Sequence, residues 1–213
     1  MNRTNVYIDG FNLFYGALKG SPYKWLDLEA LCRHLLPKDS INRIRYFTAK
    51  VSARPDDPQL PVRQDTYLRA LGTLPRVSVH LGVFYVSTMR AHLAHPPATG
   101  PRTAEIIKTE EKGSDVALAT YLMLDACRGD CDTAVLVTND SDLREPLRLV
   151  REELGLRTGV INPHSPNKRS RALQATFFKQ LRHGALAASQ FPAQITDSRG
   201  RKITKPADWA SHR

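Results

Sequence analysis

Residues 132–162, DTAVLVTNDSDLREPLRLVREELGLRTGVIN, decide the expected fold. The apolar run 134–137 is typical of a strand buried on both faces of a parallel sheet. A polar turn follows it, and leucine and valine at helical spacing then predict a helix over 143–154, which Gly155 ends. Residues 158–161 are expected to form the next strand. The polar turn of this β-α-β unit therefore lies where open α/β sheets bind their ligands.

The polar turn, TNDSD at 138–142, allows two interpretations. Asp, Asn and Ser cap helices, and acids favour the positive end of a helix dipole. One helix needs only one cap, however, and this turn offers four capping residues in a row. The turn by itself leaves capping and a functional site equally open, so the rest of the chain has to decide.

Composition limits the class of protein. The chain has 213 residues, 41% of them hydrophobic, which is long enough for one domain with a substantial core. Its net charge of +10 favours polyanionic partners. No apolar run is long enough for a membrane span, and the N-terminus lacks a signal-peptide pattern, so a cytoplasmic protein is expected. The three cysteines agree with a reducing compartment, and Cys127 and Cys131 are interpreted as free thiols rather than zinc ligands.

Strands and helices are expected to alternate along the chain. Strands are predicted at 5–9, 41–51, 77–86, 134–137 and 158–161, and helices at 11–18, 26–36, 62–74, 113–127, 143–154 and 171–188. Residues 87–112 show no regular period and are expected to form a long loop, with 104–109 as a candidate short strand. Residues 195–204 are read as a small basic hairpin. This order favours an α/β fold with a mostly parallel sheet and helices on its faces.

Four acids are expected to meet at one edge of that sheet. Asp9 and Asp140 follow strands, whereas Asp115 and Asp142 begin helices that start from the same edge. Carboxylates about 4 Å apart repel by roughly 4 kcal/mol at an effective dielectric of 20. Such a cluster is expected to hold a cation or to share protons. Oxygen ligands without Cys or His suit Mg²⁺ or Mn²⁺, and the natural partner of such an ion in a basic protein is a phosphate.

Three segments of this sequence resemble the signature segments of NYN-domain proteins, which belong to the PIN-like nuclease superfamily and include LabA-like proteins. The segments are VYIDGFNL at 6–13, KGSDVAL at 112–118 and VTNDSDL at 137–143. The resemblance spans residues 5 to about 162, keeps the order of the segments, and extends to the closing segment 195–209. Asn139 stands where relatives often have Gly. The resemblance implies a PIN-like three-layer α/β/α sandwich with a nuclease domain at 1–163, followed by a C-terminal helix and basic hairpin at 164–213.

The resemblance also implies a metal-dependent ribonuclease. The implied catalytic and metal-binding residues are Asp9, Asp115, Asp140 and Asp142. The pocket or substrate residues expected beside them are Asn12, Lys112, Asn139 and Ser141. Candidates for gripping RNA are Arg90, Arg102, Lys108, Arg199, Arg201 and Lys202. The expected cofactor is Mg²⁺ or Mn²⁺ and the expected partner is RNA, with no membrane; the oligomeric state stays open, a dimer included.

Three other functions compete with the nuclease. A non-catalytic RNA-binding or regulatory module would keep the fold and the acids. Phosphoryl transfer through an aspartyl nucleophile at Asp9 is disfavoured because Phe11 stands where the second acid would be expected. Dinucleotide binding is disfavoured because no G-x-G-x-x-G follows any of the expected strands.

Overall fold

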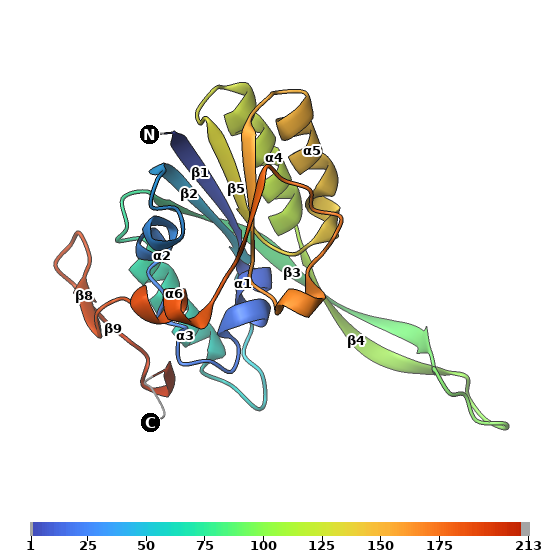
Figure 1. The fold of residues 1–213 in the computed structure, drawn as a ribbon. Helices are drawn as coiled ribbons and strands as arrows, with labels where there is room; N and C mark the ends of the chain where they lie inside the picture. The colour runs from blue at the N-terminus through green and yellow to red at the C-terminus, as the bar shows by residue number, and fades with distance from the viewer. Residues whose placement is uncertain (1, 210–213) are drawn as a thin grey trace.

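The computed structural model describes residues 2–209 and shows one seven-stranded sheet with helices on both faces (Figure 1). The sheet order is β4-β3-β2-β1-β5-β6-β7, and every neighbouring pair is parallel except β3 with β4. Its strands are β1 (Arg3–Asp9), β2 (Ser40–Ala49), β3 (Val77–His92), β4 (Thr103–Lys112), β5 (Thr133–Val137), β6 (Arg157–Asn162) and β7 (Phe177–Gln180). The predicted α/β fold is confirmed.

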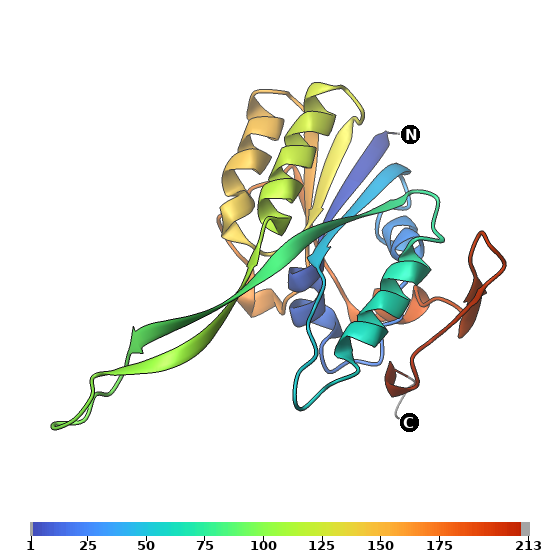
Figure 2. The ribbon, with the colours of Figure 1, turned by 180° about the vertical axis from the view of Figure 1, so that it is seen from behind.

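Two hydrophobic cores lie on opposite faces of the sheet. One core is covered by α1 (Gly10–Leu13), the π-helical turn η1 (Phe14–Leu18), α2 (Leu28–Leu35), α3 (Leu60–Leu71) and α6 (His183–Ala188). The other is covered by α4 (Ser114–Cys127) and α5 (Arg144–Glu152) (Figure 2). Side chains alternate between the cores along β5, where Val135 and Val137 face the first and Ala134 and Leu136 the second. The three layers follow from this alternation.

The loop expected at 87–112 is wrong for most of its length: β3 and β4 pair from Val83 with Lys112 to His92 with Thr103 and form a long antiparallel ribbon. The candidate strand at 104–109 is confirmed, because it lies within β4. Only the first part of β3, Val77 to Gly82, pairs with β2, so the rest of the ribbon extends away from the sheet (Figures 1 and 2). Neither face of this ribbon is covered by the core. Its sequence therefore carries no alternation of apolar and polar residues, which is the signal that identifies a half-buried strand.

The helix expected at 171–188 is also wrong. Residues 177–180 form β7 at the edge of the sheet, and only the later residues of that range form α6. Phe177 packs against the first core and Phe178 against the second, which is the two-residue period of a strand. A Cβ at Gly159 would lie 2.2 Å from the Phe177 ring, so the glycine makes room for this pairing.

The tail hairpin predicted at 195–204 is confirmed as β8 (Gln194–Thr196) and β9 (Lys202–Thr204). Short 3-10 turns complete the chain: η2 (Ser141–Leu143), η3 (Pro166–Lys168) and η4 (Ala207–Trp209). No helix within residues 2–209 is long and apolar enough to cross a membrane.

Candidate metal centre

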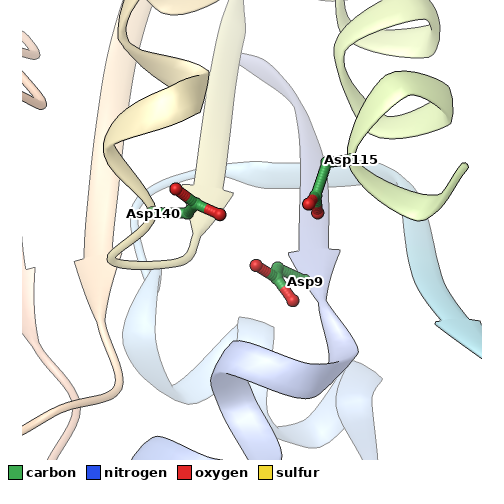
Figure 3. Close-up of side chains that lie close together, drawn as sticks. All are labelled: Asp9, Asp115 and Asp140. Atoms are coloured by element: carbon green, nitrogen blue, oxygen red, sulfur yellow. The ribbon is translucent and has the colours of Figure 1, made fainter. Parts of the chain in front are cut away.

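Three aspartates from separate elements converge at the carboxyl edge of the sheet. Asp9 is the last residue of β1, Asp140 follows β5 at the start of η2, and Asp115 lies in the first turn of α4. One oxygen of each carboxylate lies within 4.8 Å of the others, and the three side chains point toward one another (Figure 3). These three acids therefore converge as predicted.

The topology explains why acids so far apart in sequence meet. β1 and β5 are parallel neighbours in register, with Ile8 beside Val137, so both chains leave the sheet at the same edge. β4 delivers the chain to the same place, and only Gly113, in the left-handed region at φ 99°, separates it from α4. A residue with a side chain would be strained at this turn. The glycine thus lets α4 begin beside the two strand ends.

Thr138 links two of the acids. Its hydroxyl donates to Asp9 Oδ2 at 3.0 Å and accepts from the backbone N–H of Asp140 at 3.1 Å. Asp9 Oδ1 accepts from the N–H of Asn12 at 2.9 Å, and Asp140 Oδ1 accepts from the N–H of Asp142 at 3.0 Å. Asp9 and Asp140 are thus helix caps as well as members of the cluster. The two roles are compatible because a carboxylate offers about four lone-pair positions.

The cluster is electrostatically strained without a cation. Burial raises the pKa of Asp9, and burial together with the charges of Asp9 and Asp140 raises the pKa of Asp115 to about 6. Within the described chain, none of the three acids makes a salt bridge. Three hard oxygen donors that converge without a neutralising base fit a divalent cation such as Mg²⁺ or Mn²⁺.

Asp142 is not one of the three converging acids. Its side chain is exposed on η2, although it is close enough for its charge to contribute to the raised pKa of Asp115.

The sequence interpretation missed Glu111, which accepts from the backbone N–H of Ser114 at 3.1 Å and from its hydroxyl at 2.7 Å. Glu111 thereby caps α4 and fixes the turn that carries Asp115. The motif predicts no role for Thr138, although its hydroxyl links Asp9 and Asp140.

Asn12 connects the loops around the cluster. Its Oδ1 accepts from the backbone N–H of Asn139 at 3.0 Å and lies 3.0 Å from Nε2 of His164. Asn139 in turn donates to the carbonyl of Lys168 at 2.8 Å and accepts from the N–H of Ser170 at 2.7 Å. Asn12 and Asn139 thus position loops. His164 was not predicted, although it follows β6 at the same sheet edge as the acids.

The remaining predicted residues lie outside this network. Ser141 is exposed on η2, and Lys112 is exposed at the base of the ribbon. On the ribbon, Arg90 donates to Thr103 Oγ1 at 3.0 Å and Lys108 pairs with Glu110 at 2.6 Å, while Arg102 is exposed near the tip. The exposed cations of the tail turn are Arg199, Arg201 and Lys202. The ribbon and the tail hairpin extend from opposite sides of the molecule (Figures 1 and 2).

Comparison with known proteins agrees with the geometry. The model of the family described as NYN domain matches residues 3–181, which include all seven strands of the sheet. The chain belongs to the NYN-domain family. A protein of Pseudomonas putida named 6-hydroxy-3-succinoylpyridine 3-monooxygenase is 37% identical over 238 residues, which cover 97% of this chain and 75% of that protein.

A solved structure shares the NYN fold seen here. It is a crystal structure of a Vibrio parahaemolyticus protein of unknown function, which matches with a TM-score of 0.52 and 14% identity over 89% of this chain and 96% of that one. At this identity the match supports the fold and nothing about function.

Proposed function

We propose that this NYN-domain chain is a metal-dependent ribonuclease that hydrolyses internal phosphodiester bonds of RNA. The observation that carries the proposal is the convergence of Asp9, Asp115 and Asp140 within 4.8 Å of one another. A divalent ion held there would lower the pKa of a bound water and stabilise charge on the phosphate and the leaving oxygen. Mg²⁺ and Mn²⁺ are the ions that this donor set suits best.

The protein's own groups keep the acids in place for that reaction. Thr138 fixes the spacing between the strand ends that carry Asp9 and Asp140, and Glu111 holds the first turn of α4 with Asp115. Asp142 remains the predicted fourth acid at the exposed rim of the site. The net charge of +10 attracts a polyanion toward an edge that would otherwise repel it.

A cleavage assay tests the proposal. A fluorescently labelled single-stranded RNA should be cut in Mg²⁺ or Mn²⁺ and stay intact in EDTA. Asp140→Asn should lose most of the activity, while the control Asp65→Asn, on the exposed part of α3, should keep it. Cleavage that persists in EDTA would refute the metal mechanism. Retained RNA binding without any cleavage would favour a non-catalytic RNA-binding module.

The identity to the Pseudomonas putida protein supports a second candidate, the hydroxylation of a pyridine ring. That reaction needs O₂ and a reductant, and non-haem iron oxygenases commonly hold the metal with two His and one carboxylate. Within residues 2–209, the one group of His, Cys, Asp and Glu arranged to hold a metal consists of carboxylates alone. This donor set favours hydrolysis.

Oxygen consumption separates the two candidates. The protein is incubated with 6-hydroxy-3-succinoylpyridine, a nicotinamide reductant and Fe²⁺ in an oxygen electrode, and separately with RNA and Mn²⁺. The nuclease proposal expects RNA cleavage and no pyridine-dependent oxygen uptake. Uptake that depends on the pyridine, together with intact RNA, would replace the nuclease by the oxygenase.

A further inference from the structure

The structure also contains a pocket that none of the three clustered acids lines. It has a volume of about 240 Å³ and opens between α1, η1, α3 and the segment that follows β2. Six aromatic residues contribute to its walls: Phe11, Phe14, Tyr15, Tyr46, Tyr67 and Trp209. Pockets that combine aromatic walls with a few polar groups are the usual binding sites of small ligands.

Residues that neighbour Asp9 form part of the pocket wall. Gly10 and Phe11 line it and directly follow Asp9, and Tyr46 pairs with Ile8, the residue before Asp9. Gly10 makes this arrangement fit, because a Cβ there would lie 2.7 Å from the Tyr46 ring and 2.6 Å from the Phe47 carbonyl. The pocket therefore reaches the end of β1 that carries Asp9.

Contacts with neighbouring residues fix the aromatic side chains of the pocket, so the pocket exists before a ligand binds. The Tyr67 hydroxyl donates to the carbonyl of Leu26 at 2.9 Å, and its ring contacts Tyr46 and Trp209 edge-on at 6.4 and 6.1 Å between centroids. Trp209 also packs against Trp25, with 6.4 Å between ring centroids. The segment that carries Trp209 is tied down by the ion pair of Asp208 with Arg63 at 2.8 Å.

The polar rim of the pocket is positively charged. Lys19, Lys24 and Arg54 line it, and none of them makes a salt bridge within the described part of the chain. Two acids, Asp56 and Asp57, also line it, but Asp57 is neutralised by its ion pair with Arg63. The rim thus complements a ligand that joins an aromatic ring to a negative charge.

We propose that this pocket binds a planar aromatic ring that carries an anionic group, and that it places the ring beside the acidic cluster. Stacking on aromatic side chains is selective for flat rings and tolerant of their identity. Two kinds of ligand share this chemistry. One is the base of an RNA nucleotide with its phosphate, and this assignment rests on the proposed function. The other is a free aromatic acid, and this assignment is independent of the proposed function.

Isothermal titration calorimetry in EDTA tests the pocket apart from the metal. The probes are adenosine 5′-monophosphate for a nucleotide, benzoate for a free aromatic acid, and ribose 5-phosphate for an anion without a ring. We expect saturable binding of at least one aromatic anion and none of ribose 5-phosphate. Binding that is tenfold tighter for the nucleotide identifies a base as the occupant, and the reverse preference identifies an aromatic acid. Equal binding of ribose 5-phosphate, or no binding of any probe, would overturn the proposal.

Three variants locate the binding. Phe14→Leu keeps apolar bulk but removes one aromatic wall, and it should weaken the aromatic probe at least fivefold. Arg54→Gln should weaken the nucleotide more than neutral adenosine. Tyr85→Ala removes an exposed aromatic side chain from the ribbon and should change neither affinity. Unchanged affinity in Phe14→Leu, with a normal thermal melt, would exclude this pocket. Because these measurements need no metal and no cleavage, failure of the nuclease assay leaves their outcome unaffected.

Discussion

The guanidinium of Arg45 on β2 makes two hydrogen bonds, of 2.7 and 2.8 Å, with the buried carboxylate of Asp125 on α4. The ion pair is enclosed, since the exposed fractions of the two side chains are 10% and 3%. The Tyr7 hydroxyl donates to the same carboxylate at 3.0 Å, and the Tyr121 ring lies 4.4 Å from the guanidinium carbon. These contacts tie α4 to the sheet and so set where its first turn presents Asp115.

We expect Arg45→Met to destabilise the fold by about 3–5 kcal/mol, because it leaves the Asp125 carboxylate buried without its counter-ion. Arg43→Met is the matched control: Arg43 pairs with the more exposed Asp130 at 3.1 Å, and its loss should cost only about 0–1 kcal/mol. Urea unfolding of both variants measures the difference. Similar small losses in both would show that the Arg45 pair does not anchor α4.

Asp140→Asn should leave the metal-free protein as stable as the wild type or more stable. The amide keeps the cap on the Asp142 N–H but removes one of three mutually repelling charges. The wild type should gain thermal stability from Mn²⁺ and the variant should gain much less. Differential scanning calorimetry with and without Mn²⁺ measures both effects. A wild type that gains nothing from Mn²⁺ would contradict a metal centre here.

Metal binding should weaken as the pH falls below about 6. Burial and the charges of Asp9 and Asp140 raise the pKa of Asp115 to about 6, so protons compete with the ion in that range. The affinity for Mn²⁺ should fall by about tenfold per pH unit for each proton that the ion displaces. Titrations at pH 7.5, 6.0 and 5.0 test this, and Asp115→Asn should flatten the dependence.

The same shift has the opposite effect on the stability of the metal-free protein. The folded state holds the Asp115 proton more tightly than the unfolded chain, whose pKa is near 3.8. The contribution of this group is therefore full below about pH 4 and is lost as the pH rises through about 6. Urea titrations in EDTA at pH 4.5 and 7, on wild type and Asp115→Asn, isolate it. A larger loss of stability between these pH values in the variant than in the wild type would disprove the assignment.

Gly82→Ala should be destabilising by about 1–3 kcal/mol, as expected for an overpacked site. A Cβ at Gly82 would lie 2.2 Å from Oε1 of Glu111 and 2.8 Å from the carbonyl of Lys112, so the cap of α4 must move. Gly184→Ala in α6 is the control, because its Cβ meets nothing within 4 Å. Thermal melts compare the two. If Glu111 matters to the site, Gly82→Ala also binds Mn²⁺ more weakly, whereas Gly184→Ala does not.

RNA affinity should fall linearly with salt on logarithmic axes, with a slope of about −0.7 per phosphate contacted on a single strand. Replacing the three tail cations together by Gln, Arg199→Gln, Arg201→Gln and Lys202→Gln, should flatten this slope by up to about 2 if each contacts a phosphate. Arg148→Gln on α5 is the control, since Arg148 is paired with both Glu145 and Glu152, whereas of the tail cations only Arg201 is paired within residues 2–209, with Asp197. An unchanged slope in the triple variant would show that the tail cations do not contact RNA phosphates and would leave the cations of the ribbon as the candidates.

The predictable parts of this molecule are those in which burial leaves an apolar run or an apolar period in the sequence. β1 and β5 are buried on both faces; β1 ends on Asp9 and Asp140 lies in the turn after β5, so the pairing of these strands brings the two acids together. The ribbon lacks a buried face and so left no such pattern. Phe177 and Phe178 face opposite cores, but the leucines around them also satisfy a helical spacing.

The site residues that the sequence did not predict share one property. Thr138, Glu111 and His164 act through hydrogen bonds to groups far away in sequence or across a turn, and single side chains of these types are ordinary in loops. The aromatic pocket was missed for a similar reason. Its walls come from segments between Gly10 and Trp209, nearly the two ends of the described chain, and no spacing links them.

The order of the acids along the chain has a consequence for biosynthesis. Asp9 lies at the end of β1, and its neighbour β5 and the following Asp140 are translated more than a hundred residues later. In a nascent chain that still lacks β5, β1 lies at the edge of the sheet and Asp140 is absent. The three-carboxylate centre therefore assembles only after Asp140 has been synthesised, so a shorter nascent chain lacks the completed site on which the proposed RNA cleavage depends.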